Sequence, residues 1–117
     1  MSDTWHRGAK TRFVINSAVI SNPGMYTYRL IDADEARAWL ARGPVVSRVG
    51  YTATARYIRR VLGADLALSR EPTDMHSGDE ALVIRLKYRM IDPRSKAVDS
   101  PGDDEDFQLG ILLCLAR

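Results

Sequence analysis

The chain has 117 residues, 45% of them hydrophobic and 27% charged, and a formal net charge of +2. This length predicts one domain spanning 1–117, and the composition is typical of a globular protein, not a disordered one. The small net charge argues against a partner such as duplex DNA. No apolar run approaches the length of a membrane span, and the first residues lack a signal-peptide core. We therefore expect a cytoplasmic protein with no membrane partner.

The first third of the chain predicts two strands and a helix. Residues 1–11 are polar, and we expect a loose lead-in. Arg12–Ile20 is an apolar strand pattern that the turn residues Ser21–Gly24 end, and Met25–Ile31 is a second strand. The short loop between these strands favours a hairpin. Asp32 then begins a capping-box pattern for a helix that runs to about Arg42, with Ala36, Trp39 and Leu40 on its buried face.

The middle of the chain predicts a short strand, a tight turn and a second helix. Val45–Val49 is the strand, and Gly50 permits a turn that a side chain would obstruct. The helix begins near Thr52, where Thr52 or Thr54 can cap it, and ends at Gly63. Its start is rich in hydroxyl groups and suits a phosphate. Four arginines surround this stretch, and an amphipathic helix with a solvated basic face is the alternative interpretation: Arg48, Arg56, Arg59 and Arg60.

The last part predicts three more extended segments. Ser69–Met75 is expected to be an edge strand, because Pro72 cannot continue a hydrogen-bond ladder. Glu80–Met90 is the clearest strand, and its alternation puts Arg85, Lys87 and Arg89 on one face. Such a face is solvated or compensated by an anion. Residues 94–106 form an acidic loop, and Phe107–Leu115 is a final strand that buries Cys114.

These elements predict an α+β domain with about five strands in a mixed sheet and two main helices packed on it. The sequence contains no histidine cluster, acidic metal box, nucleophile elbow or glycine-rich nucleotide loop. We therefore expect no metal and no cofactor. The remaining set of hydroxyl and basic residues suits phosphate recognition. The enzymatic option is metal-independent cleavage of RNA, in which an aligned 2′-hydroxyl is the nucleophile.

Several short motifs resemble one family over most of the chain, in one order and with compatible spacing. It is the family of viral anti-CRISPR ring nucleases, first met in archaeal viruses and also found in bacteria and their phages. The motifs are Ile15-Asn16-Ser17-Ala18, Val49-Gly50-Tyr51-Thr52-Ala53-Thr54-Ala55, Leu62-Gly63, Arg70, Gly78-Asp79 and the strand ending in Arg89. The resemblance implies a homodimer, in host cytoplasm if viral, that binds a cyclic oligoadenylate messenger of type III CRISPR signalling. Cyclic tetra-adenylate is the typical ligand, and the family cleaves it without metal.

The resemblance also implies roles for individual residues. Asn16 contacts the ligand, Thr54 lies at the phosphate-binding helix start, and Arg70 comes from a loop that covers the ring. Arg85 stands where the family often has glutamine, Arg89 matches a phosphate-contacting arginine, and Asp92 stands where a glutamate supports catalysis. The full expected ligand-binding set is Asn16, Ser17, Gly50, Thr52, Thr54, Arg70, Arg85 and Arg89, with Tyr51 and Asp92 as the catalytic pair.

Tyr51 is the departure from the family pattern, because active members have a histidine after this glycine. Histidine, with an ordinary pKa of about 6.5, protonates a leaving oxygen more readily than a phenol of pKa about 10. Loss of such an acid costs on the order of 10²- to 10⁴-fold in rate. Tyr51 could still donate a hydrogen bond to phosphate or stack on adenine. The expected function is therefore binding of the messenger, with either slow cleavage or sequestration. The alternative is a dimeric protein-interaction module without a nucleotide ligand.

Overall fold

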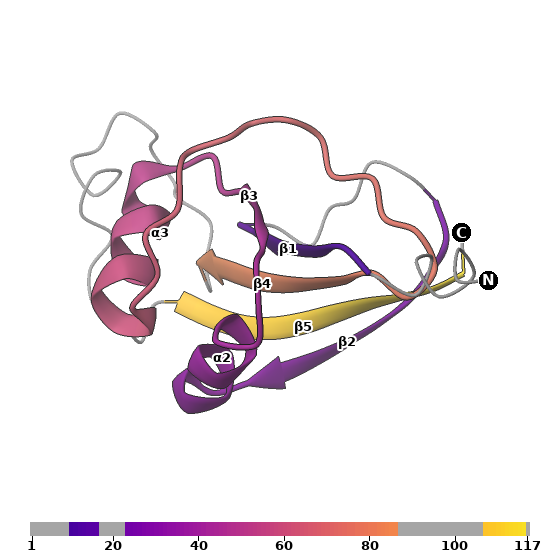
Figure 1. Cartoon of the computed structure of the whole chain (residues 1–117), viewed down its shortest axis with the longest axis horizontal. Helices are drawn as coiled ribbons and strands as arrows, with labels where there is room; N and C mark the ends of the chain where they lie inside the picture. Colours follow the sequence, from indigo (N-terminus) through magenta and orange to yellow (C-terminus); the bar gives the residue numbers. More distant parts are fainter. Residues whose placement is uncertain (1–9, 17–22, 87–106, 117) are drawn as a thin grey trace.

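The computed structural model describes residues 10–16, 23–86 and 107–116 (Figure 1). The sheet of this part has five strands in the order β2-β5-β4-β1-β3. The strands are β1 (Arg12–Ile15), β2 (Met25–Ile31), β3 (Val46–Arg48), β4 (Glu80–Leu86) and β5 (Phe107–Ala116). The helices are α2 (Ala33–Leu40), α3 (Thr52–Tyr57) and the π-helix η1 (Ile58–Leu62), which continues α3.

The sheet is mixed, which confirms the predicted α+β domain. Strand β1 lies parallel to both β3 and β4, whereas β5 runs antiparallel to β2 and β4. Because β1, β3 and β4 run in one direction, their carboxyl ends meet at the same edge of the sheet. In open sheets with parallel strands this edge is the usual place for a ligand.

The predicted hairpin between the first two strands is wrong. Strand β1 lies between β4 and β3, and β2 pairs with β5 at the opposite side of the sheet. The physical reason is burial: Phe13, Val14 and Ile15 are all buried, so both faces of β1 are covered, as in the centre of a parallel sheet. Strand β1 ends at Ile15 rather than Ile20, and residues 17–20 lie outside the described part.

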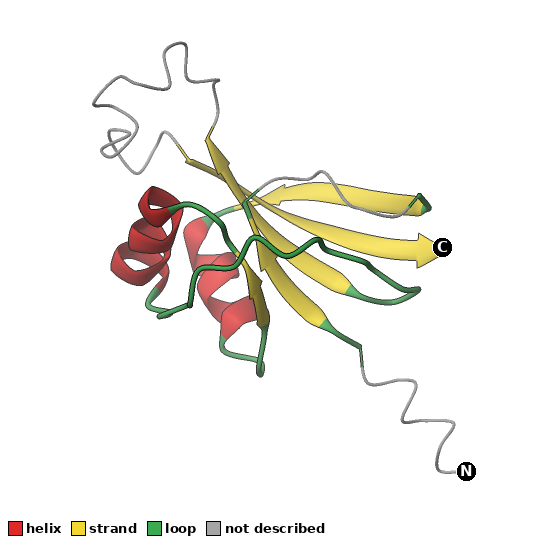
Figure 2. Cartoon of the chain, turned by 90° about the horizontal axis from the view of Figure 1, so that it is seen from above, coloured by secondary structure: helices red, strands yellow, loops and turns green. Residues whose placement is uncertain are grey.

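Both helices cover the same face of the sheet, as Figure 2 shows. Asp32 begins α2 as predicted, and its Oδ1 accepts a hydrogen bond of 2.8 Å from the Glu35 amide. The second helix begins at Thr52 and ends at Gly63, whose φ of 77° is left-handed. The predicted threonine cap is wrong, because Tyr51 occupies the N-cap position and makes no side-chain hydrogen bond there.

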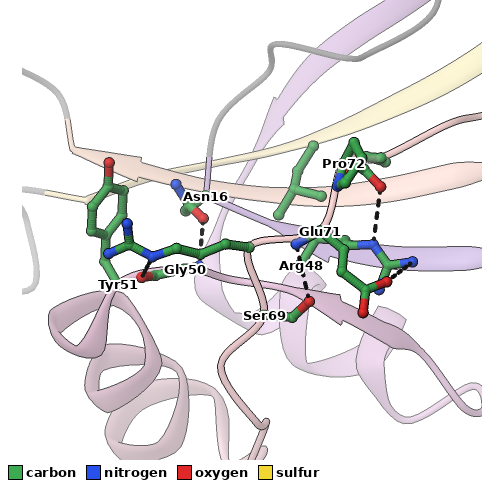
Figure 3. A pocket seen from close by; sticks show the side chains of 10 residues that line it. Asn16, Arg48, Gly50, Tyr51, Ser69, Glu71 and Pro72 are labelled. Carbon is green, nitrogen blue, oxygen red and sulfur yellow. Dashed lines mark hydrogen bonds and ion pairs between the residues drawn. The ribbon is translucent and has the colours of Figure 1, made fainter.

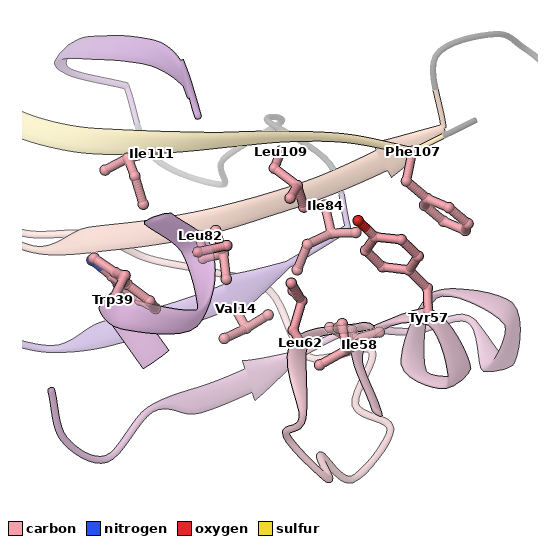
Figure 4. Close-up of a cluster of buried hydrophobic side chains, with 12 residues drawn as sticks. Val14, Trp39, Tyr57, Ile58, Leu62, Leu82, Ile84, Phe107, Leu109 and Ile111 are labelled. Carbon is pink, nitrogen blue, oxygen red and sulfur yellow. The ribbon is translucent and has the colours of Figure 1, made fainter. Parts of the chain in front are cut away.

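The main core fills the space between the helices and the sheet (Figure 4). Tyr57 of α3 stacks on Phe107 of β5 with ring centroids 4.4 Å apart. The cluster also buries Trp39, which was expected in the core, and several residues from the sheet: Val14, Leu82, Ile84, Leu109 and Ile111. The other face has its own buried cluster of Phe13, Ile15, Met75, Ala81, Val83, Leu112 and Cys114. Cys114 is thus buried as expected.

The segment Ser69–Met75 is not the predicted edge strand. The structure has an irregular connection from Gly63 to Asp79, which passes along the β3 side of the sheet (Figure 1). The Ser69 amide donates to the Val49 carbonyl over 2.9 Å, but Pro72 has no amide hydrogen to continue a ladder. The Pro72 carbonyl instead accepts a hydrogen bond of 3.3 Å from Arg48 Nε. The sheet edge on this side is therefore β3.

Arg12 ties the start of β1 to the end of α2. Its guanidinium lies 3.9 Å from the Trp39 ring centroid, and it donates to the carbonyls of Gly43, over 3.0 Å, and of Trp39. Trp39 Nε1 in turn donates to Glu80 over 2.8 Å. Burial and, after it, the neighbouring Arg42 lower the pKa of the Arg12 guanidinium, against the raising effect of Glu80. This cluster fixes the helix against the sheet.

In the part of the chain that the structure describes, no helix is both long and apolar enough to cross a membrane. The acidic segment 94–106 and residues 1–9 of the expected lead-in lie outside the described residues. On β4, Ile84 is buried and Arg85 exposed, as the predicted alternation requires, while Lys87 and Arg89 also lie outside.

Candidate ligand-binding site

The site begins where the ends of two parallel strands are joined by a hydrogen bond. Asn16 follows β1 and Gly50 follows β3, and the Gly50 amide donates to Asn16 Oδ1 over 2.9 Å. The chain then enters α3 through Tyr51. The Asn16 side chain thereby holds the turn before α3 at the carboxyl edge of the sheet.

Arg70 approaches this turn from the long connection. Its Nε donates to the Gly50 carbonyl over 3.2 Å, and a Cβ added at Gly50 would lie only 3.0 Å from Arg70 Cγ. A glycine is required here for this close approach. The Arg70 guanidinium lies 5.4 Å from the centroid of the Tyr51 ring, within the range of a cation–π contact. Figure 3 shows the Tyr51 side chain at one end of the site.

Arg48 lies at the other end of the site (Figure 3). Besides the Pro72 carbonyl, it has the Glu71 carboxylate 3.7 Å from one terminal nitrogen, and its guanidinium lies 5.7 Å from the Phe13 ring centroid. The Glu71 side chain is exposed, whereas that of Arg48 is mostly covered. An anion that enters here therefore meets the guanidinium of Arg48, which is held in place. The Glu71 carboxylate beside it can turn away into solvent.

Two adjoining cavities lie along these side chains. The smaller has a volume of about 230 Å³ and contains Asn16, Arg48 and Glu71 in its wall. The larger, of about 440 Å³, opens beside the start of α3, with Thr52, Ala53 and Leu68 in its wall. Both share a wall made of Gly50, Tyr51, Ser69 and Arg70. A ligand that spans both cavities would therefore contact the Tyr51–Arg70 pair from two sides.

The structure brings together only part of the predicted set. The residues that line one or both cavities are Asn16, Gly50, Tyr51, Thr52 and Arg70. Thr54 is buried in α3 and lines neither cavity. Arg85 is exposed near the end of β4, on the face opposite the helices, and it also lines neither. Ser17, Arg89 and Asp92 lie outside the described residues.

Sequence reasoning missed several lining residues. The sequence predicts no site role for Arg48, and it predicts a strand over Ser69–Met75, of which Ser69 to Thr73 line the smaller cavity. Pro72 could have indicated this irregular path. A proline in an apparent strand also fits an irregular segment whose carbonyls accept hydrogen bonds from neighbouring donors. The Pro72 carbonyl accepts its hydrogen bond from Arg48 in this way.

Two residues that carry part of the resemblance have a structural role at the other end of β4. The Asp79 carboxylate is buried and accepts hydrogen bonds from the amides of Thr11, over 3.0 Å, and His76, over 2.8 Å. Gly78 has a φ of 92°, which favours glycine. His76 is exposed, as expected for this turn. Within the described residues, no three histidine, cysteine or acidic side chains gather as metal ligands would.

The fold and site define a small α+β domain with a polar, partly cationic site at the carboxyl edge of its parallel strands. A family model described as STIV B116-like matches residues 12–100, and the chain belongs to this family. Among solved structures, B116 of Sulfolobus turreted icosahedral virus superposes with a TM-score of 0.66 at 18% identity, covering 88% of this chain and 98% of that chain. At this identity the likeness shows a shared fold.

A curated relative comes from a bacterium. The uncharacterized protein YddF of Bacillus subtilis (strain 168) is 32% identical over 59 residues, which is 49% of this chain and 55% of YddF. The chain thus spans about half the length of the curated relative it matches. The family therefore includes a protein from a virus, and a related sequence occurs in a cellular genome.

Proposed function

We propose that this protein binds a cyclic oligoadenylate, in first place cyclic tetra-adenylate, at the carboxyl edge of β1 and β3. The observation that carries the proposal is the meeting of Asn16, Gly50, Tyr51 and Arg70 around two joined cavities. They come from three separate stretches of the sequence, and each was expected at such a site from the resemblance to the ring nuclease family.

The electrostatics of the site suit a phosphodiester. Arg70 uses its Nε for the Gly50 carbonyl, and among the described residues no hydrogen-bond partner takes its terminal nitrogens. Those nitrogens remain available to phosphate oxygens, for which a guanidinium is a good partner. Arg48 adds a second fixed positive charge in the smaller cavity. The loss of Arg70 should weaken ligand binding on the order of 10- to 150-fold.

The bound ring has two fates in this proposal, slow cleavage or sequestration. In cleavage, the adenosine 2′-oxygen forms a bond to phosphorus and the bond from phosphorus to the 5′-oxygen breaks. The 2′-hydroxyl proton goes to a base and another proton goes to the 5′-oxygen, which leaves a 2′,3′-cyclic phosphate and a free 5′-hydroxyl. No metal is needed if the site aligns the attacking oxygen and neutralises the phosphate. Tyr51 occupies the place of the family's proton donor.

The homodimer is part of this proposal. A cyclic ligand with repeated nucleotides matches a two-fold arrangement of identical sites, because each subunit then presents the same Arg70 and Tyr51 to an equivalent part of the ring. A dimer of this kind would regulate the messenger of type III CRISPR signalling, as the family resemblance implies.

Incubation with cyclic tri-, tetra- and hexa-adenylate in the presence of a chelator tests the proposal. Native gels report binding and chromatography reports linear products. A shift with intact ring indicates sequestration, and linear products indicate a nuclease. Neither a shift nor a product with any ring, with protein that is folded by circular dichroism, would refute the proposal. Arg59→Ala is the matched control for Arg70→Ala, because Arg59 is an exposed cation on η1 that lines neither cavity.

One observation favours the second candidate, a dimeric protein-interaction module. Strand β2 is at the edge of the sheet and pairs only with β5 among the described strands, and Met25 and Leu30 on it are 65% and 60% exposed. An exposed apolar edge strand is a template for pairing with another chain. If this surface joins two copies, Leu30→Glu should convert a dimer to a monomer in light scattering, and Leu30→Ala should do so less.

A further inference from the structure

We propose that Tyr51, with Arg70 packed against its ring, is a stacking platform for one adenine base, and that the larger cavity is the base-binding subsite. This inference rests on the proposed function, because it assigns one part of the same ligand to one part of the same site. It gives Tyr51 a role in binding that needs its ring and not its hydroxyl group.

The Tyr51 ring is both exposed and held in place. Tyr51 is 57% exposed, whereas Tyr57, six residues further along the same helix, is 4% exposed and stacked in the core. The Tyr51 ring is nevertheless held, since the Arg70 guanidinium lies 5.4 Å from its centroid and is itself fixed by the Gly50 carbonyl. A ring that is fixed by a cation and still largely open to solvent offers surface to another planar group.

The larger cavity has the chemistry that a base requires. Tyr51, Ala53 and Leu68, which is 53% exposed, are among the residues that line it. These groups provide an apolar surface for a base, and the hydroxyl groups of Thr52 and Ser69 provide hydrogen-bonding groups for its edge. A volume of about 440 Å³ lies within the range of small-molecule sites.

A cavity with cationic residues adjoins the larger cavity. Arg70 and Tyr51 line both cavities, and Arg48 lines the smaller one. A nucleotide joins a flat aromatic base to an anionic phosphate. The base matches the larger cavity, and the phosphate matches the smaller cavity beside it, which Arg48 lines. Stacking of a base on an aromatic side chain is tolerant of base identity, so this platform adds affinity and position rather than base selection.

The test uses cyclic tetra-adenylate with 2-aminopurine in place of one adenine, because stacking quenches the fluorescence of this base. We expect quenching with the wild-type protein and with Tyr51→Phe. We expect at least about fivefold weaker binding and loss of quenching with Tyr51→Leu, since base stacking contributes on the order of 5- to 150-fold per base. Tyr28→Leu is the matched control, because Tyr28 is an exposed tyrosine on β2 that lines neither cavity. Melting temperatures verify that each variant is folded.

A second measurement separates this inference from the proposed function. Adenosine 5′-monophosphate is added to the protein, and nuclear Overhauser contacts are sought between adenine protons and the Tyr51 ring, with ribose 5-phosphate as the probe that lacks a base. Contacts with the mononucleotide but no binding of any ring would support the platform and refute the proposed function. Ring binding that Tyr51→Leu leaves unchanged, or that Tyr51→Phe weakens as much as Tyr51→Leu, would overturn the platform alone. No contact and no ring binding would overturn both.

Discussion

The side chain of Asn16, directly after β1, accepts a hydrogen bond of 2.9 Å from the amide of Gly50, two residues after the end of β3. This bond connects two neighbouring parallel strands at the point where the site begins. It also fixes the turn that presents Tyr51 and places the Gly50 carbonyl where Arg70 can donate to it. In the proposed function Asn16 acts on both stability and ligand binding, and substitutions can separate the two roles.

Asn16→Asp should keep the acceptor for the Gly50 amide while it adds a negative charge beside the anion site. We expect a melting temperature close to that of the wild type and at least about fivefold weaker ring binding from the added repulsion. Asn16→Ala should instead lower the free energy of unfolding by about 1 kcal/mol, because the amide loses its partner. Chemical unfolding and binding titration measure the two effects. Equal behaviour of the two variants in both measurements would contradict the assignment.

Gly50→Ala should weaken ligand binding with little loss of stability. The added Cβ would lie 3.0 Å from Arg70 Cγ, so the exposed Arg70 side chain would shift away from residue 50. Its movement costs the contacts of Arg70 with the Gly50 carbonyl and the Tyr51 ring. The expected result is a change below about 1 kcal/mol in unfolding and a clear loss of ring affinity.

Gly63→Ala is the matched control for Gly50→Ala. A Cβ at Gly63 would meet nothing within 4 Å, but the residue has a φ of 77°, where an L side chain is strained. We expect about 1 kcal/mol lower stability and unchanged ring affinity. If Gly63→Ala reduced ring affinity as much as Gly50→Ala did, the role of Arg70 in the site would be wrong.

Arg12→Lys should destabilise the fold although it keeps the charge. Lysine cannot donate to the carbonyls of both Gly43 and Trp39 as a guanidinium does, and it loses the flat contact with the Trp39 ring. The expected cost is about 2 kcal/mol in urea unfolding. Arg29→Lys is the control, because its ion pair with Glu35 is exposed and should change stability by less than about 1 kcal/mol.

Asp79→Asn should lower stability by about 1–3 kcal/mol and leave ring affinity unchanged, because this carboxylate serves the amides of Thr11 and His76 at the end of β4 remote from the site. An amide offers one acceptor oxygen in place of two. Urea unfolding and a binding titration measure the outcome. A loss of ring affinity with unchanged stability would show that this motif belongs to the ligand site after all.

Local sequence patterns predicted the positions of most helices and strands, but they did not predict which strands pair with one another. The capping pattern at Asp32 and the glycine stop at Gly63 depend on neighbouring residues, and both predictions are confirmed. The hairpin prediction also used neighbourhood in sequence, but β1 gains more by burial between β4 and β3 than by pairing with β2. That preference depends on segments more than 30 residues away in the chain, such as Val46 and Glu80.

Gly50 was expected in a tight turn from its residue type, and Asn16 was expected at the site from the family resemblance; both line the smaller cavity. A role that depends on the path of an irregular segment could not be predicted in this way. The carbonyl of Pro72 and the position of Glu71 follow from the way in which the connection passes β3, and no periodic pattern encodes that path. Thr54 illustrates the opposite error, because a hydroxyl near a helix start favours an exposed site but here it is buried.

In the proposed function, the Asn16–Gly50–Tyr51–Arg70 site binds a cyclic oligoadenylate across a two-fold dimer. Titration calorimetry with cyclic tetra-adenylate and a chelator tests it most directly, because one experiment gives both affinity and stoichiometry. We predict saturable binding of one ring per two chains, weakened on the order of 10- to 150-fold by Arg70→Ala and unchanged by Arg59→Ala. The absence of binding heat at several temperatures with folded protein, or equal affinity of Arg70→Ala and wild type, would contradict the claim.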